Sequence, residues 1–253
     1  MTDNPTQAQP QPAPENLKME IHKPKPVHSW REFLTEIGTI TLGVLIALAA
    51  EQAVEWLHWQ DKTAYATEQI RFELATDMNY FVERVMVEDC IQRRLDDLEQ
   101  KLLSSGEKWT PVAPASTIGI QAGDVVAQPS RNWSAIAWTA AVADTSVSHF
   151  SRDRLTLYAR LYGQIDAMRR LNEFESENVV RLNLLSKPVI LSSDKKNDLI
   201  GIIEAERTIN HRMARSAAQV QEAWKKIGLD PAQARAYIAK ISTTYAACQA
   251  APR

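Results

Sequence analysis

The chain of 253 residues is poor in the residues on which redox motifs, zinc sites and tight-turned β folds depend. Its two cysteines, Cys90 and Cys248, are too far apart to form a CxxC redox or zinc motif. Glycine occurs eight times, and half of the twelve prolines lie before residue 27. Scarce glycine together with abundant Ala, Leu, Glu and Arg favours helices. We therefore predict an all-α fold.

An excess of charge of one sign is also missing. The chain has 29 Lys and Arg against 31 Asp and Glu, a formal net charge of -2. This balance, with no RNP, helix-turn-helix or zinc-finger spacing, argues against a nucleic-acid partner. The chain contains no G-x-S-x-G, P-loop, H-E-x-x-H or Rossmann pattern. We therefore expect no cofactor and no enzymatic activity.

One apolar segment stands out near the N-terminus. Its uncharged run, residues 37–50, covers about 21 Å of helix, less than the ~30 Å hydrocarbon core of a bilayer. Extension to residues 33–54 gives about 33 Å and puts Glu36 and Glu51 near the two edges, where a carboxylate can be hydrated. On length, the extended segment predicts one membrane-spanning helix.

Indole side chains give a second measure of the same segment. Trp30 and Trp56 lie about 39 Å apart along a helix, close to the ~40–45 Å of a whole bilayer. Indoles favour the interface because one end of the ring is apolar and the other donates a hydrogen bond. We therefore predict a transmembrane helix at residues 29–59, with Trp30, Trp56 and Trp59 at the membrane interfaces.

Basic residues set the expected orientation. Four precede the span closely and two follow it: Lys18, Lys23, Lys25 and Arg31, then Lys62 and Arg71. This asymmetry favours an N-terminus in the cytoplasm and a C-terminal domain in the periplasm, with the anchor in the bacterial inner membrane. Two alternatives stay open: a signal peptide cleaved after Ala49, in the small-x-small sequence at residues 47–49, and a buried helix of a soluble protein.

One face of the expected span carries small and polar side chains. At 100° per residue, six residues form a narrow stripe: Glu36, Thr39, Gly43, Ala47, Ala50 and Glu51. Small residues four apart let two helix backbones approach closely, so the stripe predicts helix–helix association. A weaker hypothesis is that Glu36 or Glu51 pairs with a basic partner or relays protons.

The rest of the chain predicts helices separated by one long loop. Residues 1–28 read as a disordered, Pro-rich basic tail that ends where Ser29 caps the first helix. Apolar spacing continues that helix to Leu103, and further long helices are expected from Ser151 to before Pro188 and over residues 194–227. A short helix at residues 133–142 and a last helix after Asp230 complete an antiparallel bundle of about four helices over residues 60–253. The loop at 106–130 has room for a short strand at 118–120.

The two cysteines could be either disulfide-bonded or unpaired. In an oxidising compartment one disulfide is expected between Cys90 and Cys248, joining the C-terminus to the first long helix. In a reducing compartment both would be unpaired small apolar residues.

Other candidate sites have simple structural explanations. Glu55 and His58 have the Glu-x-x-His spacing of di-iron bundles, but no second copy exists, so we interpret them as a polar cluster at headgroup depth. His149 and His211 lack a ligand-spaced neighbour, which favours surface or capping roles over metal binding. Trp133, Trp138 and Tyr158 could line an apolar pocket, but core packing is the favoured interpretation.

The N-terminal segment resembles a known family. The sequences MEIHKPKPVHSWREF at 19–33, EIG at 36–38, GVLIAL at 43–48 and EQAVEWLHW at 51–59 are similar to a family of uncharacterised bacterial proteins with one N-terminal span. The resemblance covers residues 19–60. It implies a membrane anchor and supplies no activity and no site residues.

The leading functional hypothesis is a membrane-anchored periplasmic interaction or scaffold protein. Its expected partners are the lipid bilayer and either a second copy of the chain or another envelope protein. The alternative is a periplasmic ligand-sensing domain that signals through a partner, suggested by the long loop and the Trp-bearing short helix. A third hypothesis is an enzyme or proton-coupled accessory protein that uses Glu36 or Glu51.

Overall fold

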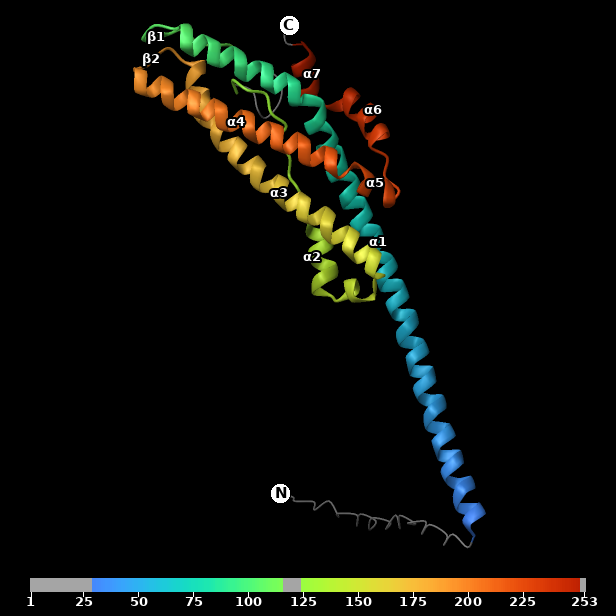
Figure 1. Cartoon of the computed structure of the whole chain (residues 1–253). Helices are drawn as coiled ribbons and strands as arrows, with labels where there is room; N and C mark the ends of the chain where they lie inside the picture. Colours follow the sequence, from blue (N-terminus) through green and yellow to red (C-terminus); the bar gives the residue numbers. More distant parts are fainter. Residues whose placement is uncertain (1–28, 116–123, 251–253) are drawn as a thin grey trace, which may run out of the picture. The chain divides into compact units, whose positions relative to one another are not determined.

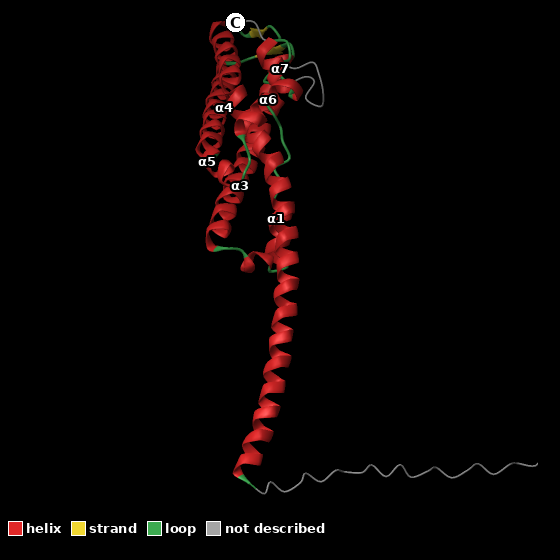
Figure 2. Ribbon diagram, turned by 90° about the vertical axis from the view of Figure 1, so that its right-hand side faces the viewer, coloured by secondary structure: helices red, strands yellow, loops and turns green. Residues whose placement is uncertain are grey.

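The computed structural model describes residues 29–115 and 124–250 (Figures 1 and 2). This part is almost entirely helical, so the all-α prediction is confirmed. The expected disordered tail at 1–28 and the expected strand at 118–120 lie outside the described residues. The elements in order are α1 (Trp30–Ser104), β1 (Lys108–Trp109), α2 (Ile136–Ala143), the 3-10 helix η1 (Ser146–His149), α3 (Arg152–Leu182), the 3-10 helix η2 (Asn183–Ser186), β2 (Val189–Ile190), α4 (Ser193–Gln219), α5 (Gln221–Lys226), α6 (Pro231–Ile241) and α7 (Thr243–Ala250).

The chain divides into two compact units, and the boundary falls inside α1. Unit 1 ends at Val54 and unit 2 begins at Glu55. The helix predicted to continue from Ser29 to Leu103 is confirmed, since α1 has no break at Trp59. The division into a transmembrane helix at 29–59 and a bundle of about four helices at 60–253 is less clear. Unit 2 combines the rest of α1 with two other long helices and four short ones within the described residues.

Unit 2 is built on three long helices. α3 and α4 run side by side in opposite directions, and the unit 2 part of α1 packs with them (Figure 1). Of the apolar residues at helical spacing on α1, Val85 is half-buried and the others are buried, as the periodicity requires: Ile70, Leu74, Met78, Phe81, Ile91, Leu95, Leu98 and Leu102.

Two apolar clusters follow one another along these helices. The first contains Ile70, Leu74 and Phe81 of α1 with Met168 of α3, and Trp224 of α5 is buried in it. The second contains, from the same three long helices, Leu95, Leu98, Val179, Leu199 and Ile203. Burying large apolar side chains contributes about 1.5–3 kcal/mol each, so these clusters are the main source of stability in unit 2.

Several helices begin or end at residues that cap them. Ser29 accepts a hydrogen bond from the Glu32 amide at 3.2 Å, and Ser151 accepts one from the Arg154 amide at 3.3 Å. Gly228 has a φ of 76°, a left-handed value that glycine adopts without strain. The amides of Gly228 and Leu229 donate to the carbonyls of Lys225 and Trp224, which closes α5 in a Schellman motif.

Three helix predictions need correction. The helix expected at 194–227 is interrupted at Val220, which separates α4 from α5. The last helix is interrupted at Ser242, which separates α6 from α7. The short helix begins at Ile136 instead of residue 133, because Trp133 is buried beside Tyr80 and Phe81 before the helix starts.

A small strand pair joins the loop after α1 to the α3–α4 connection. Trp109 pairs with Val189 and Lys108 with Ile190 in an antiparallel register. The Trp109 indole also donates to the Leu185 carbonyl at 2.8 Å. These contacts hold the start of the expected 106–130 loop against unit 2.

A disulfide joins Cys90 of α1 to Cys248 of α7, with a Cα–Cα distance of 5.5 Å. Both side chains are buried. The bond closes a chain segment with a sequence separation of 158 residues, so it attaches α6 and α7 to α1 covalently.

Cys248→Ser should destabilise unit 2. On the chain-entropy model, opening a loop this long costs about 4–5 kcal/mol of unfolding free energy. Thermal unfolding of the full chain in detergent, followed by circular dichroism, measures the loss. Reductant should lower the midpoint of the wild-type chain toward that of the variant and leave the variant unchanged; a wild-type midpoint that does not respond to reductant would contradict the prediction.

Candidate functional site

The described part of unit 1 presents an exposed apolar surface. Among the described residues, α1 is the one helix long and apolar enough to cross a membrane, and the apolar window lies near the N-terminus. None of the residues in that window is buried. Leu42, Leu45, Ile46 and Leu48, which the sequence assigns to lipid, are all exposed.

The six stripe residues also lie on the exposed surface of α1: Glu36, Thr39, Gly43, Ala47, Ala50 and Glu51. A Cβ atom built on Gly43 would meet nothing within 4 Å, so the space beside this backbone is open. The Thr39 hydroxyl donates to the Thr35 carbonyl at 2.8 Å and thus remains within its own helix. No ion pair in the described part of the chain involves Glu36 or Glu51.

The three predicted interface indoles differ in environment. Trp30 and Trp56 are exposed. Trp59 is half-buried in unit 2, where the His149 ring stacks on it with centroids 3.9 Å apart. The Lys62 ammonium lies 4.7 Å from the centroid of the same indole, and the Lys62–Asp144 pair spans 3.8 Å. Trp59 therefore attaches η1 to α1.

A buried ion pair lies in the middle of unit 2. Arg84 of α1 donates to both carboxylate oxygens of Glu175 of α3, through Nη1 at 2.6 Å and through Nη2. Both side chains are completely buried. Arg84 Nη2 also donates to the Pro129 carbonyl at 2.9 Å and to Asn172 Oδ1 at 3.2 Å. A buried charge is tolerated only when it is paired and hydrogen-bonded, and these contacts meet that condition.

Helix α4 adds two more buried polar side chains. Asn178 of α3 donates to Glu206 Oε2 at 3.3 Å, and Asn210 donates to the Glu88 carbonyl at 3.1 Å. Glu206 Oε1 and Asn210 Oδ1 have no hydrogen-bond partner. Burial, together with the nearby Glu175 carboxylate, raises the pKa of Glu206 to about 8. At neutral pH Glu206 is therefore mostly protonated.

A second ion pair, between buried Glu83 and half-buried Arg131, lies next to Arg84 on α1. The Glu83 carboxylate accepts two hydrogen bonds from the Arg131 guanidinium, both at 2.7 Å. Ser242, between α6 and α7, donates its hydroxyl to the same carboxylate. Glu83 thereby connects the loop before α2 and the C-terminal helices to α1.

These side chains form a polar layer, by which we mean Glu83, Arg84, Glu175, Glu206 and Asn210. The layer separates the two apolar clusters on every long helix. Among the buried residues of α1, the first cluster ends at Val82 and the second begins at Val87. On α3, Glu175 lies between Met168 of the first cluster and Val179 of the second. On α4, the layer lies between Ile203 of the second cluster and Met213 of the first. A shift of one helix past another would leave buried charges without partners, so the layer fixes the register of the three helices.

Sequence inspection did not single out the polar layer, although a signal was present. Each member on α3 and α4 occupies a position where the helical period demands an apolar residue. Glu175 follows Met168 by seven residues, and Glu206 follows Leu199 by seven. A charged residue within an apolar stripe is the mark of a buried polar contact, but the sequence does not say which residues pair.

A further carboxylate group lies between α1, α2 and α3. Glu73 accepts hydrogen bonds from the Tyr162 and Ser134 hydroxyls, both at 2.6 Å, and from the Ala137 amide at 3.1 Å. Burial raises the pKa of the nearby Asp77 to about 7 and, helped by Glu73, moves the pKa of Tyr162 upward. These contacts fix the start of α2.

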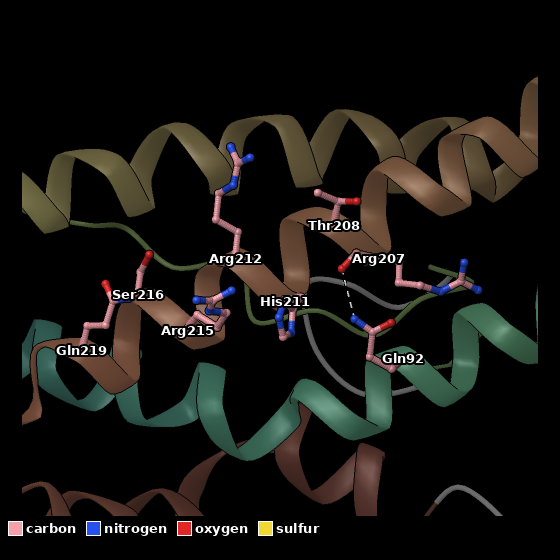
Figure 3. Close-up of a pocket in the computed structure, with 8 residues that line it drawn as sticks. All are labelled: Gln92, Arg207, Thr208, His211, Arg212, Arg215, Ser216 and Gln219. Atoms are coloured by element: carbon pink, nitrogen blue, oxygen red, sulfur yellow. Dashed lines mark hydrogen bonds between the residues drawn. The ribbon is translucent and has the colours of Figure 1, made fainter.

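A surface groove lies away from these buried groups, between α4 and α1. It is lined by Gln92, Arg207, Thr208, His211, Arg212, Arg215, Ser216 and Gln219. In Figure 3, Gln92 reaches from α1 toward α4, where its amide donates to the Arg207 carbonyl at 3.1 Å, while Arg212 and Thr208 point away from α1.

Two of the four basic side chains in this groove have acidic neighbours. Arg207 pairs with Asp96, Glu99 and Glu204, and His211 Nδ1 lies 2.8 Å from a Glu88 carboxylate oxygen. The Glu204 and Glu99 carboxylates move the pKa of Arg207 upward. The groove therefore has mixed charge.

The remaining candidate residues also have structural surroundings. Trp133 packs edge-on against Tyr80 and Phe81, and Trp138 stacks on Tyr162, so neither lines the groove of Figure 3. Tyr158 is buried against Phe150. Glu55 and His58 are exposed. Within the described residues, no group of three or more His, Cys, Asp or Glu side chains could hold a metal ion.

Comparisons with protein-family models, with curated proteins and with solved structures find no match for this chain.

Glu206→Gln should flatten the pH dependence of stability. The carboxyl of Glu206 loses its proton near pH 4.5 in the unfolded chain but near pH 8 in the folded one, so its ionisation opposes folding increasingly between these values. The variant should remove a slope of up to about 1.4 kcal/mol per pH unit between pH 5 and 7. Thermal unfolding midpoints of the full chain in detergent, measured from pH 5 to 8, give the slope.

The matched control is Glu204→Gln on the same helix, where the carboxylate is exposed. This control should keep the wild-type slope. Equal slopes for wild type and Glu206→Gln would show that Glu206 is ionised in the folded protein at neutral pH.

Proposed function

We propose that the chain is a non-enzymatic, membrane-anchored helical protein that associates with itself or with an envelope partner. The observation that carries this proposal is the apolar, uncovered surface of α1 in unit 1. Exposure of large apolar side chains to water costs about 1.5–3 kcal/mol each relative to burial, and a run of them needs an apolar environment such as lipid. The resemblance of residues 19–60 to bacterial single-pass proteins supports the same anchor.

The proposed topology has the N-terminus in the cytoplasm of a bacterial cell and unit 2 in the periplasm. The excess of basic residues before the span supports this orientation. The Cys90–Cys248 disulfide supports it independently, because structural disulfides persist in oxidising compartments and are rare in the cytosol.

The small-residue stripe supplies a surface for association inside the membrane. Gly43 is open on its exposed side, and Ala47 and Ala50 follow on the same face. Without a hydrophobic force between helices in lipid, close packing of small residues is the main source of attraction. A partner helix placed on this stripe would gain such packing.

A ligand-sensing domain is the second candidate. The groove in Figure 3 favours it, because Arg212, Arg215 and Ser216 offer polar contacts at its surface. The Trp-bearing segment that first suggested sensing is packed against Tyr80, Phe81 and Tyr162 instead. The association function therefore has the stronger support.

The topology predicts a labelling pattern. Leu103→Cys introduces an exposed thiol at the end of α1 in unit 2. A membrane-impermeant maleimide should label it in intact spheroplasts. Labelling that requires permeabilised membranes would place unit 2 in the cytoplasm.

Association through the stripe predicts a crosslink in membranes. Gly43→Cys should form a disulfide-linked dimer, or a mixed species with an envelope protein, under mild oxidation. Leu45→Cys, also exposed on α1 but outside the stripe, is the matched control and should crosslink less. Equal crosslinking at both positions would mean that the contacts are random collisions.

A further inference from the structure

Unit 2 carries an exposed aromatic face on α1 that the core does not use. Tyr65 is 66% exposed and Phe72 is 76% exposed, although both are large apolar side chains. They are seven residues apart, so they lie on one helical face, and Ile70 and Leu74 point to the opposite side, into the core. Two exposed aromatic residues one heptad apart are typical of a helix that packs on another helix.

A groove runs beside this face. It has a volume of about 550 Å³ and is lined by Ala64, Thr67, Glu68, Arg71 and Phe72 of α1, Arg154 of α3 and Leu229 after α5. Thr67 accepts a hydrogen bond from Arg154 at 3.4 Å, which closes one wall. The guanidinium groups of Arg71 and Arg154 in its lining can attract an aromatic ring from a facing helix.

The charges at the groove point to the same occupant. Glu68 and Arg71 are exposed and three residues apart, and within the described chain neither takes part in an ion pair. A surface that carries an unpaired acid next to an unpaired base is complementary to a copy of itself. In an isologous contact the acid of each copy meets the base of the other.

We propose that this face of unit 2 binds a second copy of the chain in parallel, with Tyr65 and Phe72 of each copy packed at the groove of the other and Glu68 of each paired with Arg71 of the other. The proposal rests on the proposed anchor, because anchoring in one membrane brings two chains together in the same orientation. It does not depend on the small-residue stripe, since all of its residues belong to unit 2.

A charge-swap experiment tests the proposal with the full chain in lipid vesicles. Donor- and acceptor-labelled chains report association by energy transfer as the protein-to-lipid ratio is varied. Glu68→Arg and Arg71→Glu should each weaken association at least tenfold, because each places like charges opposite one another. The double variant Glu68→Arg, Arg71→Glu should restore it, a rescue that neither misfolding nor random contact produces.

The aromatic residues have a matched control. Tyr65→Glu with Phe72→Glu should also weaken association at least tenfold, whereas Phe174→Glu, at an exposed Phe of α3, should not. Circular dichroism confirms that each variant is folded.

Different failures identify different errors. If the Glu68, Arg71, Tyr65 and Phe72 variants associate like wild type while Gly43→Ile does not, this face is not the contact and association within the membrane stands. If wild type shows no energy transfer above the random level, both proposals of self-association fail. A fluorophore attached to the new thiol of Phe72→Cys, with the rest of the chain unchanged, tests whether the bilayer covers this face. Quenching of that fluorophore by brominated lipids would show that it does and would overturn the proposal.

Discussion

Unit 2 depends on the buried ion pair of Arg84 and Glu175. Burying two charges is costly, and the attraction between them offsets this cost only when the remaining donors and acceptors are satisfied. The Pro129 carbonyl and the Asn172 side chain accept further hydrogen bonds from Nη2 of Arg84, whereas within the described residues its Nε has no partner. The loop before α2 must therefore pass over α1 at this level. Glu206 must also remain protonated there, because a second buried carboxylate next to Glu175 would have no cation of its own.

The C-terminal helices are held by the same part of α1. Ser242 is not helical, and its hydroxyl donates a hydrogen bond to Glu83. The oxygen of the same hydroxyl accepts a hydrogen bond from the Tyr245 amide at 3.1 Å, which caps α7. Six residues later Cys248 bonds to Cys90. A polar contact and a covalent bond thus attach α6 and α7 to α1 about two helical turns apart. The two cysteines themselves belong to the second apolar cluster.

The sequence predicted the features that depend on neighbouring residues. The two ends of α1, the Ser151 cap and the buried face of α1 all follow from spacing or local hydrogen bonding. The breaks at Val220 and Ser242 were missed, because a side chain from another helix decides them, as Glu83 does for Ser242. The strand pair of Trp109 and Val189 is too short to have a period. The polar layer could be suspected from charged residues in apolar stripes, but its pairing depends on three helices that the chain brings together only on folding.

The polar layer also bears on how α1 presents its outer face. On α1, Glu83 and Arg84 are buried and Phe72 is exposed. The hydrogen bonds of the two buried charges fix the rotation of α1 about its axis. The same rotation determines where the exposed aromatic residues point. An apolar core alone would tolerate small rotations, since Leu, Ile and Met can repack at modest cost. A buried guanidinium cannot, because each of its hydrogen bonds has a direction. Conformational specificity in the core is therefore a condition for a defined association surface, and this gives a physical reason for charged residues at positions where apolar ones would pack equally well.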